Sequence, residues 1–298
     1  MKIFNNYNIK NESTFRIGAT VKEVIFPNTI EELISVAANA DYILGNCSNV
    51  LFSSENINKK IIITKKLDKF SVNEDTIKVE CGTKGPLIAK EAAKRGLTGF
   101  EFLIGFPGSF GGMVCMNASA HNQSIADTFV RCRIFNLRTQ NIQELNKTQM
   151  EFSYRNSLIS DGSCILLDAE FKLKQDDEVK INEIMKRNIE FRQSRQPSLQ
   201  FGNAGSIFKN PPNDSAGRLL DLCDFKGVEE GGAKVFDKHA NFIINYNNAT
   251  SKDVLTLMNK MYSKVKEKYT IKLTPEIKYI GDENTKEYEL WKTMKENI

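Results

Sequence analysis

The sequence has little of the chemistry that builds metal centres or disulfide frameworks. It has only two histidines, His121 and His239, and its six cysteines form no C-x-x-C pair. Most of these cysteines stand beside apolar residues, as Cys115 does between Val114 and Met116. We therefore expect reduced thiols in a packed interior, and we predict neither a zinc site nor any other metal site.

Long apolar runs are also lacking. No stretch of the chain approaches the roughly 20 apolar residues that a membrane-spanning helix requires. The first residues, Met1 to Asn6, turn polar too early to form the apolar centre of a signal peptide. The sequence therefore predicts a cytoplasmic protein that does not insert into a membrane.

A strong charge of one sign is absent as well. The 41 basic and 37 acidic residues leave a net charge of +4, and no run of lysine and arginine is long enough for a nucleic-acid tail. We expect no nucleic-acid partner, but this mild charge does not choose among small anions. The 298 residues have an ordinary globular composition, with 41% apolar and 26% charged residues. A chain of this length can bury a sizeable core in two or three units.

Apolar periodicity divides the chain into a β-rich first half and a more helical remainder. Helical spacing occurs at residues 31–40, 86–95, 179–192, 216–223 and 251–269, and strand patterns occur at residues 42–44, 61–63, 77–81 and 241–245. The β-rich part extends to about Leu173, and residues 193–203 have the composition of a linker. We find no internal repeat and no low-complexity tract.

Two loops containing glycine lie in the β-rich half. The first runs from Gly45 to Asn49, and the second, Gly105 to Gly112, has four glycines in eight residues. Glycine lets the backbone approach a ligand and point its N–H groups at phosphate oxygens. Neither loop has the spacing of the Rossmann or P-loop fingerprints. A diphosphate clamp of another kind is one interpretation, and two tight turns packed within their own domain are the other.

Three separated segments carry a hydroxyl, a guanidinium and a carboxylate. Ser206 lies in the polar octet 203–210, Arg155 lies 51 positions upstream of it, and Glu276 lies 70 positions downstream. Each also has a plain structural interpretation, as a polar turn, a surface ion pair and the start of a strand. Together they have the chemistry to bind an anion and deliver a proton to it.

Eight motifs that include these residues follow one another along nearly the whole chain. They are residues 13–18 (STFRIG), 45–49, 105–118, 152–157 (FSYRNS), 203–210, 231–233 (GGA), 239–245 (HANFIIN) and 274–276 (TPE). In this order and spacing the chain resembles the UDP-N-acetylenolpyruvoylglucosamine reductase family, the flavoenzymes of bacterial cell-wall precursor synthesis. The resemblance implies an NADPH-driven, FAD-dependent reduction of the enolpyruvyl group to give UDP-N-acetylmuramate.

The resemblance also implies an α+β fold, with a two-part FAD-binding module of the vanillyl-alcohol-oxidase type followed by an α/β substrate-binding domain. The expected boundaries are residues 1–63 and 64–190 for the two FAD-binding parts and 191–298 for the substrate-binding domain. The final residues either stay in that domain or return to the FAD module. The short span between Arg155 and Ser206 resembles the subgroup that lacks the substrate-covering loop of longer members.

By resemblance, both glycine loops hold a non-covalent FAD. The residues expected at the cofactor are Gly45, Asn46, Cys47, Ser48, Asn49, Gly105, Pro107, Gly108, Ser109, Gly111, Gly112, Asn117 and Ala118. Family members commonly have three glycines where this chain has Gly45-Asn46-Cys47, so the side chains of Asn46 and Cys47 have to point away from the flavin. Ser119 and His121 likewise stand where glycine and tyrosine are common.

The resemblance assigns the catalytic roles to Ser206 as proton donor and to Arg155 and Glu276 at the substrate carboxylate. The sugar nucleotide is expected to contact Tyr154, Arg195, Lys209 and Asn210. NADPH is implied as co-substrate, and no obligate protein partner is expected. Two other functions stay open: an oxidase of this fold with FAD attached through His121 or Cys47, and a sugar-nucleotide-binding protein without catalysis.

Overall fold

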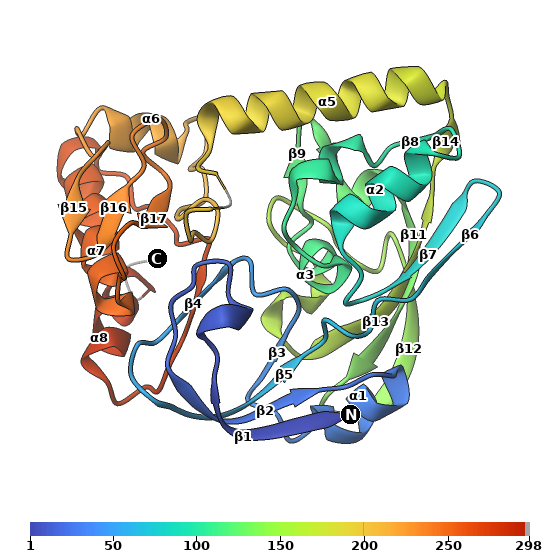
Figure 1. Cartoon of the computed structure of the whole chain (residues 1–298), viewed down its shortest axis with the longest axis horizontal. Coiled ribbons are helices and arrows are strands. Elements are labelled where there is room, and N and C mark those ends of the chain that lie inside the picture. The colour runs from blue at the N-terminus through green and yellow to red at the C-terminus, as the bar shows by residue number, and fades with distance from the viewer. Residues whose placement is uncertain (199, 296–298) are drawn as a thin grey trace. The chain divides into compact units, whose positions relative to one another are not determined.

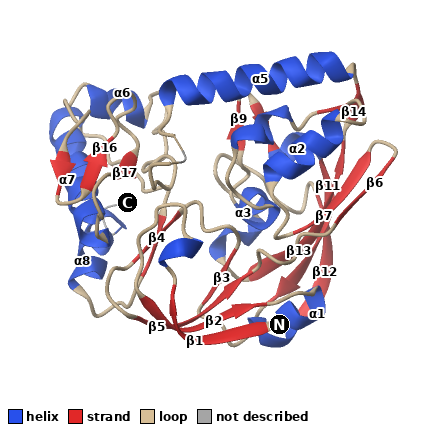
Figure 2. Ribbon diagram, viewed as in Figure 1, coloured by secondary structure: helices blue, strands red, loops and turns tan. Residues whose placement is uncertain are grey.

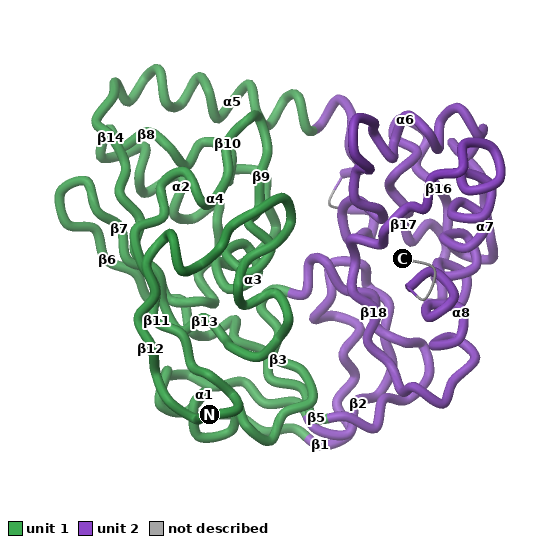
Figure 3. Tube along the Cα trace, turned by 180° about the vertical axis from the view of Figure 1, so that it is seen from behind, with its two compact units in different colours: residues 1–4, 24–46, 60–192 green, residues 5–23, 47–59, 193–298 purple. Residues whose placement is uncertain are grey.

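The computed structural model describes residues 1–198 and 200–295 of the chain. The chain forms two compact units that interleave along the sequence (Figure 3). Unit 1 comprises residues 1–4, 24–46 and 60–192, and unit 2 comprises residues 5–23, 47–59 and 193–298. Unit 2 therefore joins two short N-terminal pieces to the C-terminal third of the chain.

The first sheet has four strands in the order β1-β2-β5-β3. They are β1 (Lys2–Asn8), β2 (Thr20–Phe26), β3 (Tyr42–Leu44) and β5 (Ile57–Ile63), and the unit boundary falls within β1, β2 and β5. In unit 1, β3 pairs with β5 in parallel, which confirms the strands predicted at 42–44 and 61–63. Helix α1 (Ile30–Ala37) confirms the helix predicted before β3, although it ends three residues earlier.

The main sheet of unit 1 has five antiparallel strands in the order β12-β11-β13-β7-β6 (Figures 1 and 2). They are β6 (Phe70–Asn73), β7 (Thr76–Glu80), β11 (Phe129–Asn136), β12 (Asn141–Asn146) and β13 (Cys164–Lys172). The largely buried β13 contacts helix α3 (Phe110–Cys115). The rings of Phe100, Phe110 and Phe171 have centroids 5.2–5.8 Å apart. This aromatic cluster holds α3, and with it the second glycine loop, against the sheet.

Shorter elements complete unit 1. They are α2 (Gly85–Ala93), β8 (Leu97–Thr98), the 3-10 helix η2 (Glu101–Gly105), β9 (Ser119–Ala120), β10 (Gln123–Ser124), α4 (Ile125–Thr128), the 3-10 helix η3 (Leu158–Asp161) and β14 (Lys174–Gln175). Strand β8 pairs with β14, and β9 pairs with β10. Helix α2 confirms the helix predicted over 86–95, shifted by one or two residues.

Helix α5 (Glu178–Arg195) is longer than the sequence predicted. Its C-terminal end lies three residues beyond the predicted end at Arg192, so the linker interpretation of residues 193–195 was wrong. The physical reason is that the chain meets no helix breaker before Pro197. Leu199, in the middle of the predicted linker, lies outside the described residues.

The longest helix of unit 2 is α7 (Ser251–Tyr269), which confirms the helix predicted over these residues. Thr250 and Asp253 form a capping box at its start. One face of α7, which includes Met258 and Met261, is fully buried in the core of the unit. The periodic apolar positions of the sequence therefore face this core, as a 3.6-residue repeat requires.

The other elements of unit 2 are short. They are the 3-10 helix η1 (Lys10–Glu12), β4 (Val50–Phe52), α6 (Ala216–Asp221), β15 (Glu229–Glu230), β16 (Ala233–Val235), β17 (Ile243–Asn245), β18 (Lys278–Ile280) and α8 (Lys286–Lys295). Strands β15, β16 and β17 form an antiparallel sheet, and β4 pairs with β18 in parallel. Helix α6 and strand β17 confirm the predicted elements at 216–223 and 241–245, with shorter bounds.

A buried carboxylate joins α8 to the rest of unit 2. Glu287 is 3% exposed, and it accepts hydrogen bonds from the hydroxyls of Ser53 and Ser251 at 2.5 Å and of Tyr279 at 3.0 Å. These three donors come from the end of β4, the start of α7 and strand β18. Because a buried carboxylate is stable only when it is hydrogen-bonded, this network fixes the three elements relative to α8.

Within residues 1–198 and 200–295, none of the helices combines the length and apolar character needed to cross a membrane. Over the same residues, no three histidine, cysteine or carboxylate side chains come close enough to hold a metal ion.

Candidate cofactor and substrate site

The first glycine loop contacts the second within unit 1. The side-chain amide of Asn46 donates a hydrogen bond to the carbonyl of Pro107. A Cβ atom on Gly45 would lie 2.1 Å from Ser109 Oγ, which is closer than real Cβ contacts come. Glycine is therefore required at position 45 because Ser109 occupies the space of a side chain.

The side chain of Ser109 carries a buried hydroxyl. The residue is 1% exposed, and none of the described residues makes a hydrogen bond with its Oγ. Leaving a buried polar group unpaired costs about 1–3 kcal/mol. In helix α3, Gly112 has open space around it, since no described atom beyond its chain neighbours and its own helical backbone lies within 4 Å of the position of its Cβ. An unpaired hydroxyl next to bare glycine backbone fits the diphosphate of an FAD, which would supply the missing acceptor.

The backbone around this hydroxyl is held tightly by its own unit. The N–H of Gly111 donates to the carbonyl of Cys81 at 2.7 Å, and the carbonyl of Gly108 accepts from the N–H of Gly85 at 3.3 Å. Ala118, the last residue of the motif, is 8% exposed and donates its N–H to Met113. The loop is thus preorganised, which lowers the entropy cost of binding a ligand there.

Arg192 is a residue near this loop that the sequence analysis missed. A Cβ on Gly105 would lie 2.8 Å from Arg192 Cδ, so the arginine side chain crosses the face of this glycine. Burial lowers the pKa of Arg192, and no acidic group in the described part of the chain pairs with it. In the sequence it stands one helical turn before Arg195, and only the fold distinguishes the two arginines.

Asn117 supports the turn that carries Arg155. Its side-chain amide donates to the carbonyl of Ser153 at 3.1 Å, and its side-chain oxygen accepts from the N–H of Ala126 at 3.1 Å. Asn117 was predicted at the FAD. The structure shows that its side chain connects the start of α4 with the Arg155 turn.

Arg155 lies in a tight turn between Ser153 and Asn156, whose backbone groups bond to each other at 3.1 and 3.2 Å. Arg155 takes the left-handed conformation, with φ +55°, which is uncommon for a residue with a side chain. Its Nη1 donates to Ser119 Oγ at 2.7 Å, and its Cζ lies 5.2 Å from the centre of the Tyr154 ring. The guanidinium is therefore oriented by both an aromatic face and a hydroxyl.

In unit 2, the Ser206 segment lies between two other backbone segments. Ser206 forms a bridge with Phe242, and Phe208 forms a bridge with Pro275. The N–H of Glu276 donates to the carbonyl of Ile207 at 2.7 Å. The structure thus places the predicted proton donor and the predicted carboxyl group on neighbouring segments, although they are 70 residues apart in sequence.

The residues before and after Ser206 are also oriented by hydrogen bonds. Gly205 has φ +78°, and nothing lies within 4 Å of the position of its Cβ. The side-chain oxygen of Asn241 accepts from the N–H of Phe208 at 2.9 Å, and its amide donates to the carbonyl of Phe208 at 2.8 Å. This pair of hydrogen bonds between Asn241 and the backbone of Phe208 explains why a polar residue stands among the apolar residues of the 239–245 motif.

Asn49 connects the first glycine loop to Glu276. Its side-chain amide donates to the carbonyl of Glu276 at 2.9 Å, and its own carbonyl accepts from the N–H of Lys278 at 2.9 Å. Cys47 is 4% exposed with φ +49°, and Ser48 is half-buried. Asn49 was predicted at the FAD, and its side chain holds the backbone of Glu276, a predicted catalytic residue.

The predicted sugar-nucleotide residues differ in exposure. Tyr154 is 53% exposed, Arg195 is exposed at the end of α5, and Lys209 is half-buried. Asn210 is exposed, and its side-chain oxygen accepts from the N–H of Ala216 at 3.0 Å, at the start of α6.

The predicted site residues are divided between the two units. Unit 1 holds Gly45, Asn46, Gly105, Pro107, Gly108, Ser109, Gly111, Gly112, Asn117, Ala118, Tyr154 and Arg155, and unit 2 holds Cys47, Ser48, Asn49, Arg195, Ser206, Lys209, Asn210 and Glu276. Within unit 1, the two glycine loops contact each other, and the Arg155 turn forms a second group of predicted residues. Unit 2 brings together Ser206, Glu276 and Asn49.

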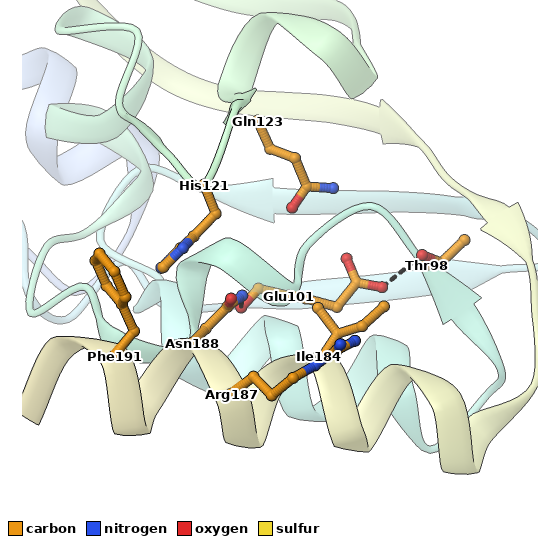
Figure 4. Close-up of a pocket in the computed structure, with 8 residues that line it drawn as sticks. All are labelled: Thr98, Glu101, His121, Gln123, Ile184, Arg187, Asn188 and Phe191. Atoms are coloured by element: carbon orange, nitrogen blue, oxygen red, sulfur yellow. Dashed lines mark hydrogen bonds between the residues drawn. The ribbon is translucent and has the colours of Figure 1, made fainter.

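Unit 1 also has an open groove of about 520 Å³ between α5 and the β9–β10 hairpin (Figure 4). It is lined by Thr98, Glu101, His121, Gln123, Ile184, Arg187, Asn188 and Phe191. The buried Glu101 already accepts from the Thr98 hydroxyl and the Gly99 N–H. None of the residues predicted at the non-covalent FAD or at the substrate lines this groove, but His121, the alternative attachment point for FAD, does.

Two family models match the chain. Residues 21–145 match the FAD-binding domain, and residues 196–280 match the C-terminal domain of UDP-N-acetylenolpyruvoylglucosamine reductase. The predicted fold class, an FAD-binding module followed by a substrate-binding domain, is confirmed.

Whole-length relatives extend this result. The UDP-N-acetylenolpyruvoylglucosamine reductase of Caldicellulosiruptor bescii is 40% identical over 294 residues, which cover 96% of this chain and 93% of that protein. The reductase of Bacillus pumilus is 36% identical over 291 residues, which cover 95% of each chain. The crystal structure of the Thermus caldophilus reductase matches with a TM-score of 0.79 and 32% identity, covering 94% of this chain and 98% of that one. The chain belongs to the UDP-N-acetylenolpyruvoylglucosamine reductase family.

Proposed function

We propose that this enzyme reduces the enolpyruvyl group of UDP-N-acetylenolpyruvoylglucosamine, with Arg155, Glu276 and Ser206 as its catalytic residues. The flavin-dependent reductase activity, with FAD as cofactor and NADPH as co-substrate, follows from membership of the family. The product, UDP-N-acetylmuramate, is a peptidoglycan precursor. The roles of individual residues are supported by the motifs and by the local geometry of each unit.

The backbone pairing around Ser206 is the observation that carries the assignment. The N–H of Lys209 donates to the carbonyl of Thr274 at 2.8 Å, and the N–H of Glu276 donates to the carbonyl of Ile207 at 2.7 Å. Two short polar segments that are far apart in sequence are therefore aligned as neighbours. A hydroxyl and a carboxyl group held on adjacent segments suit a site that places a proton at a defined atom.

The chemistry determines what the protein has to supply. The enolpyruvyl group is an alkene conjugated to a carboxylate. When bound, FAD would supply hydride, taken from NADPH, to the C3 atom of this group. Negative charge then develops on C2 and on the carboxylate. Arg155 offers a permanent cation whose planar fork matches a carboxylate, and its orientation by Ser119 and Tyr154 reduces the cost of aligning it.

Ser206 and Glu276 complete the reduction. Ser206 donates its hydroxyl proton to C2, so that hydride and proton have added across the double bond, and the serine is then reprotonated from solvent. Glu276 assists as a hydrogen-bond donor to the carboxylate, which requires a proton on its carboxyl group in the complex. Asn49 holds the Glu276 backbone in place during these steps.

The test is Ser206→Ala, with the two half-reactions measured separately by stopped-flow absorbance of the flavin. Reduction by NADPH should stay within a few-fold of wild type, and reoxidation by the enolpyruvyl substrate should slow by about 10²-fold or more. Ser206→Cys should keep more activity than alanine, because a thiol also donates a proton. Ser71→Ala, at an exposed serine on β6, is the matched control. Unchanged reoxidation in Ser206→Ala would assign proton donation to another group.

Non-covalent attachment of the flavin has its own test. Cys47 is buried at 4% exposure, and the ring of His121 packs against Phe191 in the groove beside α5. Acid precipitation of the yellow protein should therefore release FAD into the supernatant. Flavin that stays with the pellet would favour the covalent oxidase, and a colourless protein would favour the binding protein without catalysis.

We infer a cytoplasmic location, because the reaction draws on NADPH and a UDP-sugar, which are both cytoplasmic metabolites. We also propose that the enzyme needs no obligate protein partner and no nucleic acid; a net charge of +4 without a long run of lysine and arginine supports the second expectation.

A further inference from the structure

Ser119 is the hydrogen-bond acceptor for Arg155. Arg155 Nη1 lies 2.7 Å from Ser119 Oγ, which is a normal distance for a charge-assisted hydrogen bond. A glycine at this position has no side chain to offer. The contact therefore depends on the Ser119 hydroxyl.

The position of Ser119 is well defined by its hairpin. Ser119 pairs with Ser124 across strands β9 and β10, and a two-residue turn joins the strands. The turn residues His121 and Asn122 have φ +53° and +60°, the left-handed values that a tight antiparallel hairpin of this type needs at both positions. Figure 4 shows the side chain of His121 next to Phe191 of α5. The two rings lie edge-on, with centroids 5.3 Å apart. The hairpin is thus braced against α5, and its strand holds Ser119 at Arg155.

The proton of the Ser119 hydroxyl is available for another acceptor. A hydroxyl has one O–H donor and two acceptor positions. The guanidinium of Arg155 uses one acceptor position, and no group in the described part of the chain accepts the Ser119 proton. Donation from a cation to the oxygen also polarises the O–H bond and makes it a stronger donor.

We propose that Ser119 and Arg155 together bind the substrate carboxylate, with Ser119 accepting a hydrogen bond from Arg155 and donating its own proton to a carboxylate oxygen. This inference rests on the proposed function, in which Arg155 binds the enolpyruvyl carboxylate. Ser119 adds a second donor beside the guanidinium without adding charge. It is thus a specificity residue for the carboxylate-bearing sugar nucleotide.

The test compares two ligands that differ in the carboxylate. Binding of UDP-N-acetylenolpyruvoylglucosamine and of UDP-N-acetylglucosamine, which lacks the enolpyruvyl group, is measured on the oxidised holoenzyme by perturbation of the flavin spectrum. Ser119→Ala should weaken binding of the first ligand by about tenfold or more, as expected for a lost hydrogen bond to a charged group, and leave the second unchanged. Ser119→Thr keeps the hydroxyl and should stay close to wild type. Ser153→Ala, at an exposed serine beside Arg155, is the matched control.

Three results would overturn the inference. Unchanged binding of both ligands in Ser119→Ala would show that the hydroxyl is not used. Equal weakening of both ligands would show a structural effect on the hairpin. A defect in Ser119→Gly but not in Ser119→Ala would show that the backbone, not the hydroxyl, matters.

Arg155→Gln distinguishes this inference from the proposed function. If Arg155→Gln weakens the carboxylate ligand selectively and Ser119→Ala does not, only the role of Ser119 falls. If Arg155→Gln has no selective effect, the proposed role of Arg155 fails, and the shared site fails with it.

Discussion

Replacing Gly45 with alanine should destabilise the protein through a single atomic contact. The added Cβ would lie 2.1 Å from Ser109 Oγ and 3.5 Å from Ser109 Cβ. The first distance is far too short for non-bonded atoms, and the second is an ordinary contact. Because Ser109 is 1% exposed, its hydroxyl has little room to move away.

The size of the effect follows from this overlap. Forcing one extra carbon into a packed region costs about 1–3 kcal/mol. For a protein of this size class, each kcal/mol lowers Tm by about 2–4 °C, so we expect a decrease of about 2–12 °C. Gly45 does not have a positive φ, so the backbone itself tolerates alanine and the clash is the main term.

The double variant isolates the contact. Ser109→Ala removes the clashing Oγ and leaves its Cβ in normal contact, so Gly45→Ala/Ser109→Ala should recover most of the lost Tm. Gly112→Ala is the matched control, because nothing lies within 4 Å of its Cβ and alanine is favoured over glycine in a helix. Its Tm in the flavin-free protein should be unchanged or slightly higher.

The assay is thermal unfolding of the flavin-free protein followed by far-UV circular dichroism, repeated with added FAD. If FAD supplies the acceptor for Ser109, then Ser109→Ala should reduce the stabilisation that FAD gives without lowering Tm in its absence. The reasoning would be refuted if Gly45→Ala matched wild type, or if removing the Ser109 hydroxyl failed to rescue it.

Three further predictions concern unit 2. Glu287→Leu should lower the free energy of unfolding by about 3–5 kcal/mol, because three buried hydroxyls lose their common acceptor. Glu287→Gln should lower it by less, and chemical denaturation measures both variants. Equal effects would mean that the hydrogen-bond network is not the source of the lost stability. Burial lowers the pKa of His239, whose Nδ1 accepts a hydrogen bond from the Asn241 N–H at 3.2 Å. The stability that the neutral imidazole contributes should therefore be full above about pH 6.5 and decrease as the pH falls through that value toward the folded-state pKa. The Tm of His239→Gln should depend less on pH between pH 5 and 8 than the Tm of wild type, and an identical profile would contradict this. Asn49→Ala should slow flavin reoxidation by substrate while the flavin content stays near wild type, because the lost hydrogen bond holds the Glu276 carbonyl. Loss of FAD with normal reoxidation of the remaining bound flavin would assign Asn49 to the cofactor instead.

The sequence by itself determined the local elements and the family. The helix at Ser251–Tyr269 could be predicted because apolar positions recur there with helical spacing. The order of the eight motifs indicated the reductase family and its flavin. Each motif is a continuous stretch of residues, so it can be found without knowing the fold. Helix α5 shows the limit of local reasoning, because the polar residues 193–195 suit both a linker and a helix end.

Only the tertiary structure decided which residues meet. The Asn49 amide and the Glu276 carbonyl are 227 positions apart in sequence, and Arg155 reaches Ser119 across 36. Nothing in the linear spacing showed that Ser109 fills the side-chain space of Gly45, or that Arg192 rather than Arg195 crosses Gly105. Backbone preferences act over a few residues, whereas these contacts arise within each unit, when its own core packs and brings distant segments within hydrogen-bonding distance.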